Sequence, residues 1–422
     1  MKKMYALFIV LAASIGSVWA QTTVEVDGIN YDLNMISGIA QVAFSPNASG
    51  DITIPATISY NGNNYDVTAI GNEAFLHCID LTKIELLNSV TMIGEYAFSG
   101  CIELSSVVFE EGSRLTSIGQ WTFSACANLG SIDIPDGVTE IGYGTFHSCN
   151  KLTSVRLPNS LTTIRSTAFH GTGLTKITIP ANVTFIDGMV FSGCPNLEII
   201  EISEGNRSYQ FIDGNLLTAD GTTLIACLNS RIDNSYKIPA GVRIIGQTAF
   251  LNCVNLTNIE ISNSVTTIGG FAFAGSGLTE ITLQSKTPPS LNGTNIFGNG
   301  TLTAIIVPEG SEEAYKSYVA TTDEWGQTND SWSNYAHLIK SNPTSTERIN
   351  DIAVIAYPNP TTGIITVTGL TAGEAIKMYS LSGAQVGSYV APAAEMTIDL
   401  SNLSSGMYFV STGGQMVRII KK

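Results

Sequence analysis

The sequence predicts a mainly β protein, in which a repeat solenoid with an N-terminal β cap is followed by a small C-terminal β-sandwich. Three observations predict this fold class. One short phrase recurs along most of the 422 residues. Charged residues make up only 13% of the chain and glycine occurs 40 times, which favours many short turns between short strands. Closely spaced strand patterns replace the phrase after residue 345.

Residues 1–20 have the pattern of a secretory signal peptide. Lys2 and Lys3 form the positive start, the apolar run 5–13 follows, and Val18-Trp19-Ala20 is a small-residue cleavage site. The alternative is a transmembrane helix, but this apolar run is too short to span a bilayer. We therefore expect an exported protein without a transmembrane segment in its mature chain.

Residues 21–66 lack the recurring phrase and are predicted to form an N-terminal β cap. The segment at 24–33, VEVDGINYDL, has a hairpin pattern around Asp27-Gly28. Residues 51–67 continue in strand-like alternation. A cap is needed because the end of a solenoid otherwise exposes its core.

Residues 67–310 carry the phrase and are predicted to form the solenoid. The spacings between the aligned phenylalanines are 23, 25, 23, 23, 22, 59, 23 and 24 residues, and most lie within the range of leucine-rich repeats. No single repeat can bury its apolar residues alone, so neighbouring repeats must stack. We expect one internal column of nine rings: Phe75, Phe98, Phe123, Phe146, Phe169, Phe191, Phe250, Phe273 and Phe297.

Each repeat contains one strand and a second bend. Residues 132–135, Ile-Asp-Ile-Pro, alternate between inward and outward positions, and the proline ends the strand. The pair Ile141-Gly142 marks the bend. The interval of 59 residues contains two Asp-Gly pairs between apolar runs, which predicts a hairpin insert at about 205–235. We interpret this insert as structural, with a flap that contacts a ligand as the alternative.

The phrase at 138–158, VTEIGYGTFHSCNKLTSVRLP, resembles the BspA-like leucine-rich repeat. The resemblance covers about residues 25–310 and includes the hairpin insert. It implies a leucine-rich-repeat solenoid. Members of that family are surface adhesins that bind host matrix proteins or other cells, so the resemblance implies a similar role here.

Residues 311–340 are predicted to cap the C-terminal end of the solenoid with a short helix and with Trp325 and Trp332. Residues 341–349 are rich in Pro, Ser and Thr and are interpreted as a linker. Residues 350–422 then show about seven short strand patterns, as in a small β-sandwich.

This tail resembles the C-terminal sorting domain of the type IX secretion system. The resemblance implies passage through the outer membrane, with the type IX machinery as a partner and the bacterial surface or extracellular space as the destination. The alternative is a small carbohydrate-binding or fibronectin-like sandwich. The matching residues include Tyr357, Pro358, Asn359, Pro360, Gly363, Gly383, Gly406, Lys421 and Lys422.

Charge and motifs exclude several classes of function. The formal net charge of −15 repels nucleic acid and anionic lipid. The acid pairs Glu110-Glu111 and Glu312-Glu313 are adjacent, so on a strand they would face opposite ways rather than act across a substrate. The sequence contains no motif for nucleophilic catalysis, phosphate binding or zinc hydrolysis. We predict a protein that is not an enzyme and has no cofactor or metal.

Cysteine and histidine recur at fixed positions of the repeat. Six of the seven cysteines lie three residues after the aligned phenylalanine, where two other repeats have Thr172 and Ser276. We interpret this as a ladder of small buried thiols, with disulfides between adjacent repeats as the alternative. His147 and His170 share another position and are interpreted as surface turn residues, with a zinc pair as the alternative.

The outward positions of the repeat strands are the candidate binding surface. Stacking brings the middle residue of each strand into one row, and the preceding outward position adds a second. The alternative is an ordinary solvated sheet face. The candidate residues are Lys83, Glu85, Asp133, Arg156, Lys176, Thr178, Glu201, Glu260, Glu280 and Thr282, and Val108 also lies in the row.

The favoured function is adhesin-like binding of a host or cell-surface protein through this outward face. Extended solenoid surfaces suit large ligands because many weak contacts can be spread along them. Capture of a glycan or mucin is the alternative, but it needs exposed aromatic residues, and the row has none; Tyr60, Tyr65 and Tyr143 lie elsewhere. A hydrolase is the least favoured hypothesis.

Overall fold

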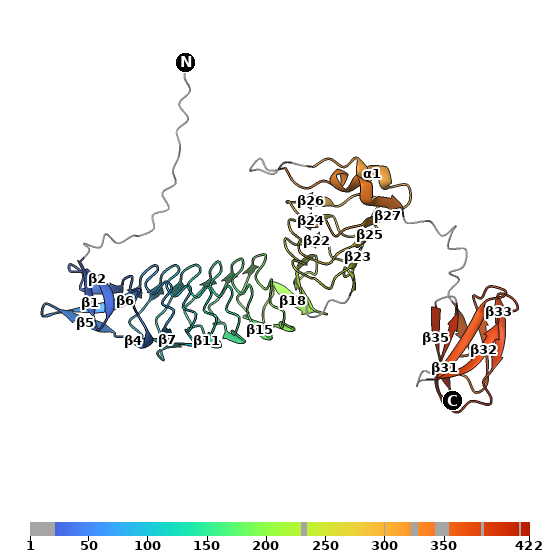
Figure 1. Ribbon diagram of the computed structural model, residues 1–422, viewed down its shortest axis with the longest axis horizontal. Coiled ribbons are helices and arrows are strands. Elements are labelled where there is room, and N and C mark those ends of the chain that lie inside the picture. The colour runs from blue at the N-terminus through green and yellow to red at the C-terminus, as the bar shows by residue number, and fades with distance from the viewer. Residues whose placement is uncertain are drawn as a thin grey trace, which may run out of the picture. The chain divides into compact units, whose positions relative to one another are not determined.

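The computed structural model describes residues 22–228, 234–298, 300–320, 322, 328–341, 354–380, 384–412 and 415–422. The predicted signal peptide lies outside these residues. The chain divides into two compact units, one that ends at Lys340 and one that begins at Ser341 (Figure 1).

The first strands form a cap that continues into the repeats. Strands β1 (Thr22–Val26), β2 (Ile29–Asn34) and β3 (Ile39–Val42) pair antiparallel, and Asp27-Gly28 makes the predicted first turn. Strand β5 (Thr57–Tyr60) forms a second hairpin with β6 (Asn63–Ile70). Because β3 pairs parallel with β6, the cap passes directly into the stacked repeats.

The repeats build two sets of parallel strands, which we call the main ladder and the minor ladder. Main-ladder pairing runs through β4-β7-β9, β11-β13, β15-β17 and β21-β23-β25-β27. The strands are β4 (Gly50–Ile54), β7 (Leu81–Leu86), β9 (Ser106–Phe109), β11 (Ser131–Asp133), β13 (Ser154–Arg156), β15 (Lys176–Ile179), β17 (Ile199–Ile202), β21 (Ser235–Lys237), β23 (Asn258–Ile261), β25 (Glu280–Leu283) and β27 (Ala304–Val307).

The minor ladder replaces what the sequence suggested was only a bend. Ile141 lies in a two-residue strand that pairs parallel with its neighbour in the next repeat, and Gly142 follows it. The strands after β6 are β8 (Met92–Ile93), β10 (Ser117–Ile118), β12 (Glu140–Ile141), β14 (Thr163–Ile164), β16 (Phe185–Ile186), β22 (Ile244–Ile245), β24 (Thr267–Gly269) and β26 (Ser290–Asn292).

A tight coil carries each aligned phenylalanine into the core. The residues two before and two after Phe98 are Tyr96 and Gly100, and both have left-handed backbones, with φ of 56° and 75°. The same two positions are left-handed around Phe123 and Phe146. This geometry turns the chain sharply on both sides of the ring, and each coil then hydrogen-bonds to the next, as from Phe98 N–H to Thr122 O at 2.9 Å.

The aligned rings form two columns rather than the single column of nine that the sequence predicted. Six rings stack from Phe75 to Phe191, with centroids 5.2–6.1 Å apart. Three more stack from Phe250 to Phe297 at 5.1 and 5.8 Å. The apolar core is divided in the same way into two clusters.

The break between the columns is the predicted hairpin insert. Strands β18 (Tyr209–Ile212), β19 (Asn215–Thr218) and β20 (Thr223–Cys227) pair antiparallel, and β20 then pairs parallel with β22. Adjacent residues of a strand face opposite ways. Leu216 therefore packs into the first core and Leu217 into the second. The insert separates the columns because each face of β19 closes one of them.

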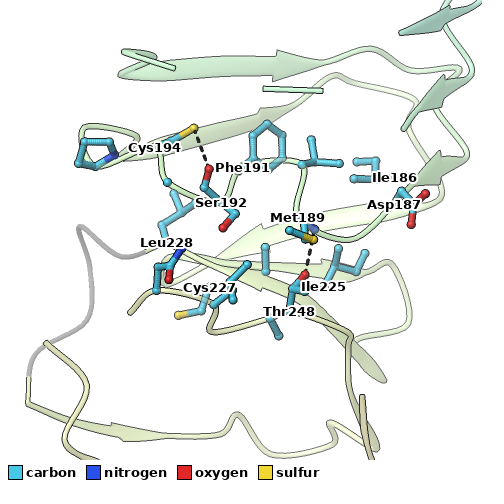
Figure 2. A pocket seen from close by; sticks show the side chains of 17 residues that line it. Ile186, Asp187, Met189, Phe191, Ser192, Cys194, Ile225, Cys227, Leu228 and Thr248 are labelled. Atoms are coloured by element: carbon cyan, nitrogen blue, oxygen red, sulfur yellow. Dashed lines mark hydrogen bonds between the residues drawn. The ribbon is translucent and has the colours of Figure 1, made fainter. Parts of the chain in front are cut away.

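Figure 2 shows the cavity of about 170 Å³ at this junction. Met189 and Phe191 line it from the last repeat of the first column, and Ile225 and Thr248 line it from the other side. The Met189 N–H donates a hydrogen bond to Thr248 Oγ1 at 2.9 Å, which joins repeats that are 59 residues apart.

The C-terminal end of the solenoid is closed by helix α1 (Glu312–Lys316), the 3₁₀ helix η2 (Trp332–Leu338) and β28 (Ile339–Ser341). Trp332 is fully buried, lies 5.4 Å from the Phe297 ring, and donates from Nε1 to Pro289 O at 2.7 Å. Trp332 therefore fills the predicted capping role, whereas Trp325 lies outside the described residues.

The second unit contains two antiparallel sheets, ordered β29-β30-β33 and β32-β31-β34-β35. Ile365, Val367, Ile376 and Ile398 lie in a shared core. The strands are β29 (Ile355–Tyr357), β30 (Ile364–Thr368), β31 (Ala375–Ser380), β32 (Gln385–Val390), β33 (Glu395–Asp399), β34 (Gly406–Thr412) and β35 (Gln415–Lys421).

Candidate binding surface

The main ladder brings the predicted outward residues together in pairs. The register places Asp133 opposite Arg156, Thr178 opposite Glu201, and Glu260 opposite Thr282. Glu85 lies opposite Val108, and the second row places Lys83 opposite Ser106, Lys176 opposite Ile199, and Glu280 opposite Asn258.

Ion pairs between neighbouring repeats balance the charges of this surface. Arg156 Nε lies 3.6 Å from Asp133 Oδ2, as the sequence suggested, and Lys176 Nζ lies 2.6 Å from Glu201 Oε1. Hydrogen bonds from Lys176 and then Thr178 lower the pKa of the Glu201 carboxyl. Lys83 and Glu85 pair within one strand at 3.4 Å.

Lys237 is a member of the row that sequence reasoning missed. It lies opposite Glu260 on β21, and its Nζ is 2.8 Å from Glu260 Oε1. Glu201 and Glu260 belong to separate stretches of the main ladder. The signal was present, because Tyr236-Lys237-Ile238-Pro239 repeats the Ile-x-Ile-Pro pattern.

A surface hollow of about 600 Å³ lies beside the Asp133–Arg156 pair. Glu110 and Glu111 line it from the turn after β9, and Val108 also lines it. The repeat that contains this turn is 25 residues long rather than 23, so the extra residues stand beside the row. Arg156 is the only cation among the lining residues.

The cysteines are free and buried. Four thiols donate to the backbone carbonyl of the phenylalanine one repeat earlier, as from Cys149 Sγ to Phe123 O at 3.1 Å; they belong to Cys101, Cys126, Cys149 and Cys194. Burial raises the pKa of Cys149 to about 12, so the thiol stays protonated and unreactive near neutral pH. These contacts agree with the interpretation of a buried thiol ladder.

Within the described residues, no group of three or more His, Cys, Asp or Glu side chains is placed to hold a metal ion. His147 and His170 are not simple surface turn residues, because their rings stack at 4.8 Å and are half-buried. Burial lowers the pKa of both imidazoles, and proximity to His147 lowers that of His170 further.

In the second unit, the tail motif holds the first loop against the last strand. Asn359 Nδ2 donates to Arg418 O at 2.5 Å, and Ile420 N–H donates to Asn359 Oδ1 at 2.9 Å. Lys421 is buried, and its Nζ donates to Ser401 O at 3.1 Å. Residues from both ends of the motif thus meet in space.

The remaining motif residues surround these contacts. The peptide bonds before Pro358 and Pro360 are cis. The carbonyl of Gly363 accepts from Leu400 N–H at 2.7 Å, and Lys422 N–H donates to Thr361 O at 2.8 Å. Tyr357 ends β29, Gly406 begins β34, and Gly383 lies outside the described residues.

Comparison with known proteins agrees with this architecture. Residues 68–198 and 226–324 match a model of the BspA type leucine rich repeat region in six copies. Residues 355–422 match a model of the secretion system C-terminal sorting domain. No curated protein matches the chain significantly.

Solved structures give the same result. The chain is 32% identical to a leucine rich cell surface protein from Faecalibacterium prausnitzii, with a TM-score of 0.54, over 68% of this chain and 83% of that one. It is 23% identical to the pneumococcal vaccine antigen PcpA, with a TM-score of 0.57, over 68% and 82% of the two chains. The second likeness supports the fold alone.

Proposed function

Because the chain belongs to the BspA-type leucine-rich-repeat family and ends in a secretion-system sorting domain, we propose that it is an adhesin-like binding protein. It holds a host or cell-surface protein through the outward face of the main ladder. The sorting domain directs export to the outer-membrane surface or the extracellular space. No helix in the described residues is long and apolar enough to span a membrane.

The hollow beside Arg156 is the observation that carries the proposal. The side chains of Arg156 and Asp133 are 54% and 74% exposed, so a partner can reach both. Exposed ion pairs contribute only about 0–1 kcal/mol, so exchanging one for a contact with a partner costs little. The hollow can receive an anchoring side chain of the partner, and a few such anchoring residues carry most of the binding energy of a protein interface.

Protein binding agrees with the rest of the chain. Leucine-rich-repeat scaffolds are typical of binding proteins that are not enzymes, and repeat stacking makes a long surface for a large ligand. We infer that the candidate residues act as contact residues. Their mixed charge favours a partner that presents both signs rather than a polyanion or a polycation.

The test reverses two charges of the row together, as Arg156→Glu with Glu260→Lys, in the full-length protein. Surface plasmon resonance against a panel of purified host extracellular-matrix proteins measures the affinity. We expect a loss of at least tenfold, because both reversals turn attraction to the partner into repulsion. Thermal unfolding should be nearly unchanged.

The matched control reverses two exposed charges away from the row, as Glu103→Lys with Lys151→Glu. It leaves the net charge unchanged, as the first pair does, and should retain full affinity. Wild-type affinity in the Arg156 and Glu260 double variant would show that the outward face of the main ladder does not bind the partner.

A further inference from the structure

A second surface of the solenoid carries exposed rings that the sequence did not bring together. It comprises Tyr96, Trp121, Tyr143, His147, His170 and Phe185, which we call the aromatic strip. These residues come from the minor ladder and the coil around the aligned phenylalanine, not from the main ladder. Tyr96 and Tyr143 are each 39% exposed, and Phe185 is 45% exposed.

The rings of the strip follow one another from repeat to repeat. The centroids of Tyr96 and Trp121 are 6.4 Å apart with planes within 4° of parallel. Trp121 and His147 are 5.3 Å apart, and His147 and His170 are 4.8 Å apart. The strip is therefore narrow and continuous along the direction in which the repeats stack.

Arg165 joins the other two aromatic rings of the strip to each other. Its guanidinium carbon lies 5.9 Å from the centroid of Tyr143 and 5.4 Å from that of Phe185. Nη2 of Arg165 is 3.0 Å from Glu140 Oε2, so this cation is already neutralised. The strip thus presents aromatic carbon and hydrogen-bonding groups with little net charge.

The backbone makes room for the Trp121 ring. Trp121 and Gly144 occupy the same left-handed position in successive repeats, with φ of 56° and 58°. A Cβ at Gly144 would lie 2.3 Å from Cε3 of Trp121, so any side chain there would displace the indole. Because residue 144 is glycine, the Trp121 indole can lie over the backbone of the next repeat.

Polar atoms of the strip have unused hydrogen-bonding capacity. Arg165 Nε and His170 Nδ1 are buried and have no hydrogen-bond partner among the described residues. A buried polar atom without a partner destabilises the folded chain, because it has lost its hydrogen bonds to water. A ligand rich in hydroxyl groups could satisfy such atoms after a small rotation of the side chains, whereas a purely apolar ligand could not.

We propose that the aromatic strip binds a neutral, linear glycan, in addition to the protein partner of the main ladder. A pyranose ring has apolar C–H faces that pack on aromatic rings and hydroxyl edges that hydrogen-bond to imidazole, guanidinium and carboxylate groups. A linear chain of such rings matches side chains that recur along five successive repeats. The net charge of −15 disfavours strongly anionic polysaccharides.

A polypeptide fits this strip less well. Anchoring side chains of protein partners enter desolvated pockets. The junction cavity and the hollow beside Arg156 are not lined by residues of the strip. An aligned run of ring faces suits a repeating sugar chain better.

The experiment is affinity electrophoresis of the full-length protein through gels that contain hydroxyethyl cellulose, galactomannan or gastric mucin. We expect hydroxyethyl cellulose or galactomannan, which are both neutral, to retard the wild type. Trp121→Gly with Tyr143→Ala should weaken that retardation at least tenfold. Glycine is the native residue at the Trp121 position of the next repeat, so this variant should keep its fold, which circular dichroism checks.

The matched control is Phe271→Gly, which removes a 40% exposed ring from the same left-handed position in the second column. It should change retardation less than twofold, as should the Arg156 and Glu260 double variant. Absence of retardation by both hydroxyethyl cellulose and galactomannan would overturn the proposal, as would equal losses in Phe271→Gly. Mucin binding that survives periodate oxidation of its sugars would assign the strip to a polypeptide and also overturn it.

Discussion

The stacked phenylalanines allow a quantitative test of how the solenoid is stabilised. Phe146 is fully buried between Phe123 and Phe169, with both centroids 5.6 Å away and planes within 4° and 8° of its own. Phe75, also fully buried, begins the column and stacks on one ring of it, that of Phe98, at 5.2 Å. Leucine in place of either residue keeps an apolar side chain but removes the ring contacts.

Each aromatic pair contributes about 0.5–1.5 kcal/mol beyond the area that it buries. Phe146→Leu loses two pairs and should therefore lower the free energy of unfolding by about 1–3 kcal/mol. Phe75→Leu loses one pair, so the part of its loss that comes from ring contacts should be about half as large. The difference between the two losses, about 0.5–1.5 kcal/mol, is a better test than either value, because the loss of ring volume is common to both variants and cancels.

Urea unfolding measures the two losses, with far-ultraviolet circular dichroism and tryptophan fluorescence as two independent probes of the transition. Repeat proteins can unfold in parts, so the slope of the transition must stay constant for the comparison to hold. Equal losses at Phe75 and Phe146 would refute the reasoning. They would show that the phenylalanines stabilise the solenoid only by burying apolar area, with no added contribution from the ring contacts.

Two further predictions concern titratable groups. Burial holds the pKa values of His147 and His170 below 6.5, so the unfolded chain takes up protons first and stability should fall as the pH drops from about 6.5 through these lowered values. His170→Gln should flatten this dependence in urea midpoints measured from pH 7 to pH 5, and an unchanged slope would contradict the assignment. Burial also raises the pKa of Cys101 and of Cys149 to about 12, so iodoacetamide at pH 8 should leave both thiols unmodified in the folded protein and alkylate them in 6 M guanidinium. Intact-mass spectrometry distinguishes the two states, and rapid alkylation of the folded chain would show that the ladder is open to solvent.

The repeat period was enough to predict much of the solenoid and part of its surface. A spacing of 23 residues predicts that Phe123 stacks on Phe146. Asp133 and Arg156 have the same spacing, and they too lie side by side. Both follow because strands of adjacent repeats pair in register. The turn at Asp27-Gly28 was also predictable, because its left-handed residues are a local property of the chain.

Other features depended on packing between distant residues. The hairpin could be predicted from Asp213-Gly214, but its effect on the core could not, because only the fold shows that Leu216 and Leu217 face different cores. For the same reason Lys237 was not recognised as the neighbour of Glu260.

The sequence by itself determined the period, the inward rings and the outward alternation of the strands, since these follow from spacing along the chain. The tertiary structure decided which side chains of the coils meet. Trp121 reaches His147 across repeats because the backbone at Trp121 and Gly144 is left-handed. The alternation of inward and outward residues in the strands does not predict which way the side chains of the coils point. The aromatic strip is therefore recognised only in the stacked repeats.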